Sequence, residues 1–227
     1  MSLDAPRLDP AQVADRFGSR PVLRHDVVHE GIVFDMVADQ VDLGEGGIVT
    51  REYLEHPGAV VIMAMRGEPG AEEIALIQQY RHPMAVTEWE LPAGLLDMDG
   101  EPPFEAARRE LAEEADLRAS TWHVLADYVA SPGGMGEALR IYLARDLTPV
   151  PLDERHEREA EEVGMPIGWL GLDDALDVAL SGRVNNAALL IGVLAAHAAR
   201  ARGWSSLRPV DTPWPQHPSF RPGGMRS

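Results

Sequence analysis

Three carboxylates lie close together in the middle of the chain. Glu110, Glu113 and Glu114 follow Arg109 in the run Arg-Glu-Leu-Ala-Glu-Glu. On a helix, at about 100° per residue, these glutamates share one arc about 100° wide, and like charges so close weaken a helix unless a cation lies between them. Carboxylate oxygens are the ligands that Mg²⁺ prefers and that Mn²⁺ accepts. The run therefore predicts a divalent cation site, with a solvated acidic helix face as the alternative.

The residues before the glutamates favour the cation site. Trp89–Gly94 is predicted to end a strand, and a loop rich in Gly and Asp continues to Gly100. Pro102–Ala115 has the composition of a helix, with Pro in the first turn followed by Ala, Leu, Glu and Arg. Phe104 and Leu111 fall on one apolar stripe, which must face the core. A core-packed helix after such a loop can hold its carboxylates in fixed positions.

The surrounding sequence predicts a mixed α and β domain around this helix. Ala59–Met65 and Ile74–Tyr80 are short apolar runs typical of buried strands. Further strands are expected at Trp122–Ala130, Ala138–Ala144 and Met165–Leu170, and further helices at Asp173–Ser181 and Asn185–Arg202. Gly203 is expected to cap the last helix.

Composition divides the chain into three parts. Residues 1–57 contain a short helical pattern at Pro10–Phe17 and then β-branched runs broken by Gly and Asp, which predict an antiparallel β-subdomain. Pro57-Gly58 marks the boundary to the main domain, residues 58–204. Residues 205–227 hold five prolines and few apolar residues, and predict an extended tail.

Charge and composition exclude several classes of protein. The chain has 227 residues, 45% of them hydrophobic, and a formal net charge of −17. It has no Cys and no Lys, which excludes a thiol nucleophile, a zinc-thiolate site and a lysine Schiff base. Such an acidic chain is a poor partner for nucleic acid or an anionic membrane. A phosphorylated substrate would need a bound divalent metal and a few well-placed arginines.

We expect a cytoplasmic protein. The first residues lack the charged segment and apolar run of a signal peptide. The longest apolar stretch, Ala187–Ala196, is far shorter than the roughly 20 residues that a membrane span needs.

The segment from Gly94 to Leu117 resembles the Nudix box, the loop–helix metal site of the Nudix family. That motif runs Gly, five residues, Glu, seven residues, Arg-Glu, an aliphatic residue, any residue, Glu-Glu, any residue, Gly and an aliphatic residue. The chain matches it from Glu101 through the glutamates to Leu117. It departs in two places, because six residues separate Gly94 from Glu101 and Asp116 replaces the last Gly. Neither departure removes a carboxylate.

Other segments resemble the ADP-ribose pyrophosphatase subfamily, most closely its actinobacterial members. The resemblance covers about residues 22–205, and the segments that carry it are Arg51-Glu52, His56–Val60, Gln79–Pro83, Trp89–Gly94 and Ser131–Gly134. Pro132, fifteen residues past Leu117, matches a proline typical of this group. The resemblance implies an α+β fold: a Nudix α/β/α sandwich with a mixed β-sheet plus the N-terminal antiparallel β-subdomain.

The implied reaction is metal-dependent hydrolysis of ADP-ribose to AMP and ribose 5-phosphate. Two alternatives remain: a broader nucleoside-diphosphate-sugar hydrolase, and a sensor that binds ADP-ribose without cleaving it. The sensor is disfavoured because every box carboxylate is present and the net charge opposes DNA binding.

The resemblance also implies residue roles. Glu110 and Glu114 would be the main ligands of Mg²⁺, with Mn²⁺ as the second candidate metal. Glu113 would be an additional ligand, and the backbone carbonyl of Ala93 would complete the set. Gly94, Glu101 and Arg109 would be structural, with Arg109 paired to Glu101; direct contact of Arg109 with phosphate is the alternative.

The general base is expected in a charged loop late in the chain. By resemblance it is Glu161 or Glu162, acting with Glu114 as the catalytic carboxylates. The alternative is that the loop glutamates are solvated charges. Arg81 is expected to contact the diphosphate or a ribose, Leu95 to contact substrate through its backbone, and Glu137 to bind a ribose or a water.

The resemblance finally implies a homodimer. Its N-terminal subdomain would exchange across a two-fold axis and contribute to the partner's active site. Arg51 and Glu52 match positions that, in the family, hold the adenine end of the substrate. They would then act partly in the active site of the neighbouring subunit.

Overall fold

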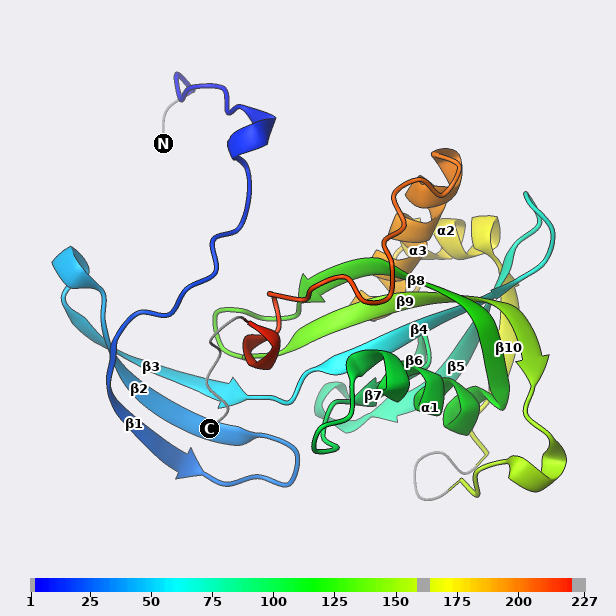
Figure 1. The fold of residues 1–227 in the computed structure, drawn as a ribbon, viewed down its shortest axis with the longest axis horizontal. Helices are drawn as coiled ribbons and strands as arrows, with labels where there is room; N and C mark the ends of the chain where they lie inside the picture. Colours follow the sequence, from blue (N-terminus) through cyan, green and yellow to red (C-terminus); the bar gives the residue numbers. More distant parts are fainter. Residues whose placement is uncertain (1–2, 159–163, 222–227) are drawn as a thin grey trace.

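The computed structural model describes residues 3–158 and 164–221, folded into a small N-terminal sheet and a larger main domain (Figure 1). The N-terminal sheet is antiparallel, in the order β1 (Val22–His29), β2 (Asp35–Asp42) and β3 (Ile48–Glu55). It extends away from the rest of the molecule, and this agrees with the predicted β-subdomain.

The helix expected at Pro10–Phe17 is wrong. Only a 3-10 turn, η1 (Pro10–Gln12), forms there, with the Asp9 carboxylate accepting a hydrogen bond from the Ala11 N–H. Every residue of that stretch is exposed, so the helical pattern has no apolar surface to pack against. Short helices without such packing are not stable in water.

The main sheet is mixed, as predicted. Its strands are β4 (Ala59–Arg66), β5 (Glu73–Arg81), β6 (Val86–Glu90), β7 (Ala93–Leu95), β8 (Leu117–Val129), β9 (Ala138–Pro149) and β10 (Ile167–Gly171). The order is β10-β5-β4-β9-β8, with β6 beside β5 and β7 beside β4. The central pair β4 and β9 is parallel, and the other pairs are antiparallel.

Helices cover both faces of this sheet, namely α1 (Pro103–Ala115) on one face, and α2 (Leu172–Leu180) and α3 (Ala187–Ala201) on the other. Side chains of β4 alternate between the two layers, because successive residues of a strand point to opposite faces. Val60 and Ile62 share a core cluster with Leu111, whereas Val61 and Met63 pack in the cluster that contains the α3 residues. Burial on both faces explains why β4 is wholly apolar, and the predicted α/β/α sandwich is confirmed.

The end of β3 joins the main domain through hydrogen bonds. The Leu54 N–H donates to the Gly134 carbonyl at 3.1 Å, and the Gly136 N–H donates to the Leu54 carbonyl at 2.8 Å. The glycine-rich turn between β8 and β9 therefore lies against the link between the N-terminal sheet and the main domain.

The segment after α3 is irregular, as its prolines predict, yet as far as residue 221 it packs onto the domain. Trp214 and His217 are only 3% exposed. Arg140 explains part of this packing: its guanidinium pairs with Asp127, and it also donates to the carbonyls of Thr212 and Pro213. A buried arginine needs such partners, and here the C-terminal segment supplies two of them.

None of the helices in the described part of the chain is long and apolar enough to cross a membrane.

Candidate active site

The last turns of α1 meet the backbone of β7. Glu114 is buried, with 6% of its surface exposed, and its Oε2 accepts a hydrogen bond from the Ala93 N–H at 2.8 Å. Gly94 lies against Glu110, and a Cβ built on Gly94 would fall 2.0 Å from the Glu110 carboxyl carbon. The fold therefore brings Ala93, Gly94, Glu110 and Glu114 together, and a residue larger than glycine at position 94 would displace Glu110.

Arg109 connects the loop to the helix. Its Nε and Nη2 donate to the two oxygens of Glu101 at 3.1 and 3.0 Å. Its Nη1 donates to Glu110 at 2.6 Å and to Glu113 at 3.0 Å. The hydrogen bonds that Arg109 donates to Glu101, together with the charge of Glu110, raise the pKa of Arg109. Arg109 is thus one cation that offsets the repulsion between neighbouring glutamates.

The donor set of this region fits a hard divalent cation. Across the described ranges, no group of three or more His, Asp or Glu side chains forms a preformed cage for a metal ion. Such a cage is not required, because Mg²⁺ keeps several waters and uses one or two carboxylates plus substrate phosphates. Glu110 and Glu114, held beside the β7 backbone, supply carboxylates of this kind.

Asp116 has two roles that the box pattern does not reveal. It ends α1 in the left-handed conformation, with φ of 54°, which Asp tolerates better than most residues. Its carboxylate accepts a hydrogen bond from Arg158 at 2.9 Å and lies 3.6 Å from Arg155. Arg158 also donates to the Glu114 carbonyl at 2.9 Å. Two arginines after β9 therefore tether that segment to the end of α1.

The expected general bases follow Arg158 in the sequence by three and four residues. Glu161 and Glu162 fall outside the described residues. Sequence reasoning missed the Asp116 tether, and the only signal for it was the pair of arginines three residues apart in a charged loop.

Arg81 is held by a buried carboxylate. Its Nε and Nη2 donate to the two oxygens of Glu90 at 2.8 and 2.7 Å, and the Glu90 side chain is 4% exposed. Glu90 ends β6, only three residues before Ala93 of β7. The pair thus places the half-exposed guanidinium of Arg81 beside the segment that enters the box. Leu95, half-buried, ends β7.

Glu137 lies near the link between the two sheets, where its carboxylate is 3.7 Å from His56 Nε2. Burial, and then the charges of Glu137 and Glu90, raise the pKa of Tyr128. Tyr128 on β8 is therefore an electrostatic neighbour of both carboxylates. The sequence carried no signal for it, because it stands within an ordinary strand pattern.

Arg51 and Glu52 are not brought to the box within one chain. Both are exposed on β3, where Arg51 Nη1 donates to the Thr50 carbonyl at 3.0 Å. Among the residues that the structure describes, no hydrogen bond or ion pair joins either of them to α1 or β7. Figure 1 shows the N-terminal sheet extending away from these elements.

The fold and the candidate site together indicate the protein family. The model of the NUDIX domain matches residues 55–190, which is more than half of the chain, and the chain belongs to the Nudix family. The family resemblance seen in the sequence is thereby confirmed. Nudix hydrolases generally need divalent metal ions, which agrees with the carboxylates of the box.

Within the Nudix family, the chain is similar to proteins named as ADP-ribose pyrophosphatases. The chain is 44% identical over 194 residues to the ADP-ribose pyrophosphatase of Mycobacterium tuberculosis, covering 86% of this chain and 90% of that protein. It is 33% identical over 160 residues to the ADP-ribose pyrophosphatase of Bacillus subtilis, covering 70% and 83%. A crystal structure of an ADP compounds hydrolase superposes with a TM-score of 0.65 at 22% identity, covering 84% of this chain and 99% of that one, and this likeness supports the fold.

Proposed function

We propose that this protein hydrolyses the diphosphate linkage of ADP-ribose to give AMP and ribose 5-phosphate. The observation that carries the proposal is the meeting of Glu110 and Glu114 with the backbone of Ala93 and Gly94. The two relatives named as ADP-ribose pyrophosphatases support the choice of substrate.

Glu110 and Glu114 are the proposed main metal ligands, with Glu113 and the Ala93 carbonyl completing the set. Mg²⁺ is the proposed metal, and Mn²⁺ is the alternative that the same oxygens accept. The bound metal would neutralise charge on the diphosphate and lower the pKa of the attacking water. Arg109, paired with Glu101, keeps the loop after β7 closed onto α1, and Gly94 leaves the space that Glu110 occupies.

The protein's own residues complete the reaction. Glu161 or Glu162 would take a proton from the water as it attacks one phosphorus, and the bond from that phosphorus to the bridging oxygen breaks. Arg155 and Arg158 orient the segment that leads to these glutamates. Arg81, held in place by Glu90, would contact the diphosphate or a ribose. Leu95 and Glu137 would hold the remainder of the substrate.

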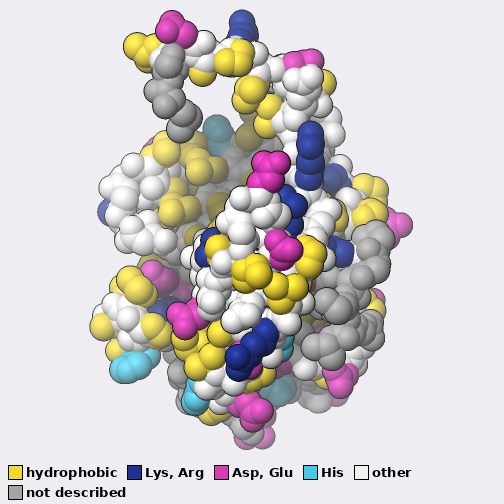
Figure 2. Space-filling model, turned by 90° about the vertical axis from the view of Figure 1, so that its left-hand side faces the viewer, with side chains coloured by type: hydrophobic (Ala, Val, Ile, Leu, Met, Phe, Trp, Pro, Cys, Tyr) yellow, Lys and Arg dark blue, Asp and Glu magenta, His cyan; other side chains and the backbone are white. Residues whose placement is uncertain are grey.

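We further propose that two copies form a homodimer through residues 1–57. Apolar side chains that are exposed on this part include Val22, Leu23, Val27, Val28, Val33, Phe34 and Ile48. Figure 2 shows several separate groups of hydrophobic side chains, with charged side chains between them, on the face at this end of the molecule. Exposed apolar surface of this kind marks interaction sites. In such a dimer, Arg51 and Glu52 would reach the partner's active site.

We also propose that residues 58–204 form the catalytic domain and that residues 205–227 form a C-terminal tail. The expected location of the protein is the cytoplasm.

The test is product analysis with purified protein. ADP-ribose is incubated with Mg²⁺, with Mn²⁺ and with EDTA, and AMP and ribose 5-phosphate are quantified. The proposal expects equal amounts of both products, formed only with metal. GDP-mannose and UDP-glucose are compared in the same assay, and faster turnover of either would favour the broader hydrolase. Binding of ADP-ribose without turnover would overturn the proposal in favour of a sensor.

A further inference from the structure

A cavity of about 430 Å³ lies at the opposite end of β4 from its pairing with β7. Val61, early in β4, pairs with Ala93, whereas Met65 and Arg66 at the end of the same strand line the cavity. At about 3.3 Å per residue, roughly 13–17 Å of strand separates the two places. The cavity is therefore separate from the place where β7 meets Glu110 and Glu114, although Leu117, the last residue of the box segment, also lines it.

Arg145 on β9 lines this cavity and has two unsatisfied hydrogen-bond donors. Its Nε and Nη2 are covered from solvent and have no hydrogen-bond partner among the described residues. These two nitrogens form the edge of the guanidinium that binds a carboxylate with two parallel bonds. Elsewhere in this chain, Arg81 and Arg140 use the same edge to hold Glu90 and Asp127. Buried donors without partners are rare and costly in folded proteins.

The carboxylates nearest to Arg145 are bound to other groups. Glu72 accepts hydrogen bonds from Arg200 at 3.1 Å and from the Gly70 N–H at 3.0 Å. Asp146 accepts a hydrogen bond from the Thr121 hydroxyl. Burial lowers the pKa of Arg145, and the charges of Glu72 and Asp146 oppose this effect without cancelling it. Within residues 3–158 and 164–221, Arg145 thus lacks the paired carboxylate that a covered guanidinium usually has.

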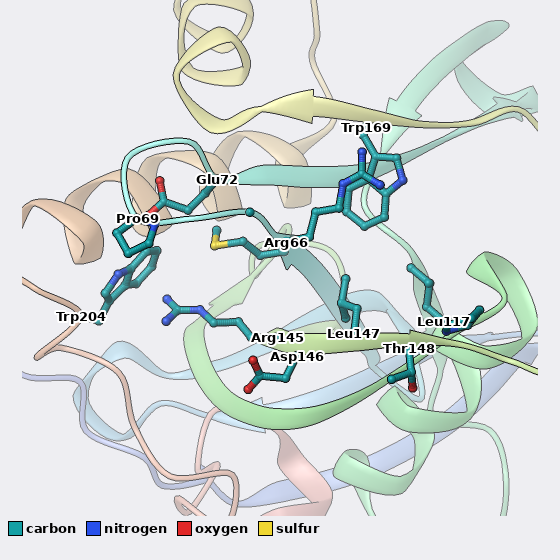
Figure 3. A pocket seen from close by; sticks show the side chains of 13 residues that line it. Arg66, Pro69, Glu72, Leu117, Arg145, Asp146, Leu147, Thr148, Trp169 and Trp204 are labelled. Carbon is teal, nitrogen blue, oxygen red and sulfur yellow. The ribbon is translucent and has the colours of Figure 1, made fainter.

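Two tryptophans shape the cavity. The Arg145 guanidinium lies 3.8 Å from the centre of the Trp204 ring, and the Arg66 guanidinium lies 4.0 Å from that of Trp169. Figure 3 shows Arg145 reaching toward Trp204 at one end of the cavity and Arg66 lying against Trp169 at the other. The Nε of Arg66 donates a hydrogen bond to Glu73, whereas the Nε and Nη2 of Arg145 have no such partner among the described residues.

We propose that this cavity binds a small organic oxyanion through the Nε–Nη2 edge of Arg145. The ligand carries a carboxylate or a phosphate on an apolar or aromatic body. The anion satisfies the two donors, and the body lies among the tryptophans and the apolar lining. The volume is within the range of small-molecule sites, which are mostly apolar with a few polar groups that fix orientation.

The test is calorimetric titration of the full-length protein with benzoate and with phenyl phosphate, using neutral benzamide as the control ligand. We expect saturable binding of at least one anion with a Kd of about 1 mM or tighter, and none of benzamide. The stronger anion identifies the head group. Arg145→Lys keeps the charge but loses the fork, and should weaken binding about tenfold or more. The matched variant Arg24→Lys, on the exposed surface of β1, should bind as the wild type does.

A second measurement needs no variant at Arg145. The chain has five tryptophans, and their indole N–H signals are followed by NMR during the same titrations. The signals of Trp169 and Trp204, assigned with Trp→Phe variants, should shift in proportion to the occupancy measured by calorimetry. Binding that leaves both signals unmoved would overturn the proposal. So would the absence of saturable anion binding, equal binding of benzamide, or unchanged binding by Arg145→Lys.

Discussion

The carboxylate of Glu114 accepts a hydrogen bond from the backbone N–H of Ala93 at 2.8 Å, which fixes the last turn of α1 to β7. One turn earlier, Glu110 fills the space beside Gly94 that a side chain would otherwise occupy. Two box carboxylates are thus oriented by backbone atoms that lie outside the helix. The loop between β7 and α1 can therefore vary in length while these contacts persist, which accounts for the extra residue before Glu101.

Gly94→Ala is expected to reduce activity strongly. The new Cβ would fall 2.0 Å from the Glu110 carboxyl carbon, so Glu110 must move away from its position in the site. We expect kcat to fall about tenfold or more and the metal concentration for half-maximal activity to rise. The control is Gly168→Ala, because a Cβ there meets nothing within 4 Å. Unchanged kinetics in Gly94→Ala would show that the position of Glu110 is unimportant.

Arg109→Met is expected to destabilise the metal-free protein by about 1–3 kcal/mol, since it leaves the partly buried Glu101 without its paired guanidinium. It also removes a cation between Glu110 and Glu113. Mg²⁺ should therefore raise the melting temperature of this variant more than that of the wild type. The control is Arg108→Met, which loses an exposed pair with Glu105 and a contact of its guanidinium with the Phe104 ring. Equal melting temperatures of wild type and Arg109→Met in EDTA would contradict the structural role.

Asp116→Asn is expected to lower kcat several-fold with little change in stability. The substitution removes the charge that holds Arg158 and Arg155, and so loosens the segment leading to the proposed bases. Steady-state kinetics at saturating Mg²⁺ measures the effect. Glu154→Gln serves as the control, because Glu154 in the same segment pairs with the exposed Arg118 instead. The same kcat in both variants would show that the contacts of Asp116 with Arg155 and Arg158 do not support catalysis.

The stability of the protein should depend on His217 at mildly acidic pH. His217 Nε2–H donates to the Pro57 carbonyl at 2.7 Å, and Nδ1 accepts from the Ser219 N–H at 3.2 Å. Burial first, and then the charges of Arg221 and His56, lower the pKa of His217 below its ordinary 6.5. Below about pH 6.5 the unfolded chain therefore binds this proton before the folded chain does. The contribution of His217 is present above that pH and is lost on acidification, at up to about 1.4 kcal/mol per pH unit.

Urea unfolding between pH 8 and pH 5 tests this prediction. His25 acts in the opposite direction, because its hydrogen bond to Asp39 raises its pKa, and its contribution is lost as the pH rises. The informative quantity is thus the difference between wild type and His217→Gln. It should shrink as the pH falls, whereas His29→Gln, on the exposed surface, should track the wild type throughout. A pH-independent difference for His217→Gln would refute the assignment.

Sequence patterns were sufficient where neighbouring residues decide the structure. The helix predicted at Pro102–Ala115 is observed at Pro103–Ala115, and the apolar run Ala59–Met65 is β4. Gly203 follows the last helix with a positive φ of 60°, as expected for a residue after a helix end. In each case the composition and the local turn chemistry favour the same structure.

Local sequence patterns did not predict the contacts between segments that lie far apart in the chain. Strand β9 continues to Pro149, five residues past its predicted end, because it pairs with β8 as far as Leu117. The C-terminal segment lies against the domain because Arg140 and Asp127 are buried beneath it. The Asp116 tether likewise joins residues about forty positions apart. Composition carries no information on such pairs.

One measurement tests the central claim most directly: the rate of AMP release from ADP-ribose by wild type, Glu114→Gln and Glu105→Gln, each across a range of Mg²⁺ concentrations. Glu105 lies on the same helix but is exposed and pairs with Arg108, so its variant controls for loss of one carboxylate. We predict a fall of about 100-fold or more in Glu114→Gln, wild-type rates in Glu105→Gln, and no activity of any form in EDTA. Metal-independent AMP release, or a Glu114→Gln variant as active as Glu105→Gln, would contradict the account.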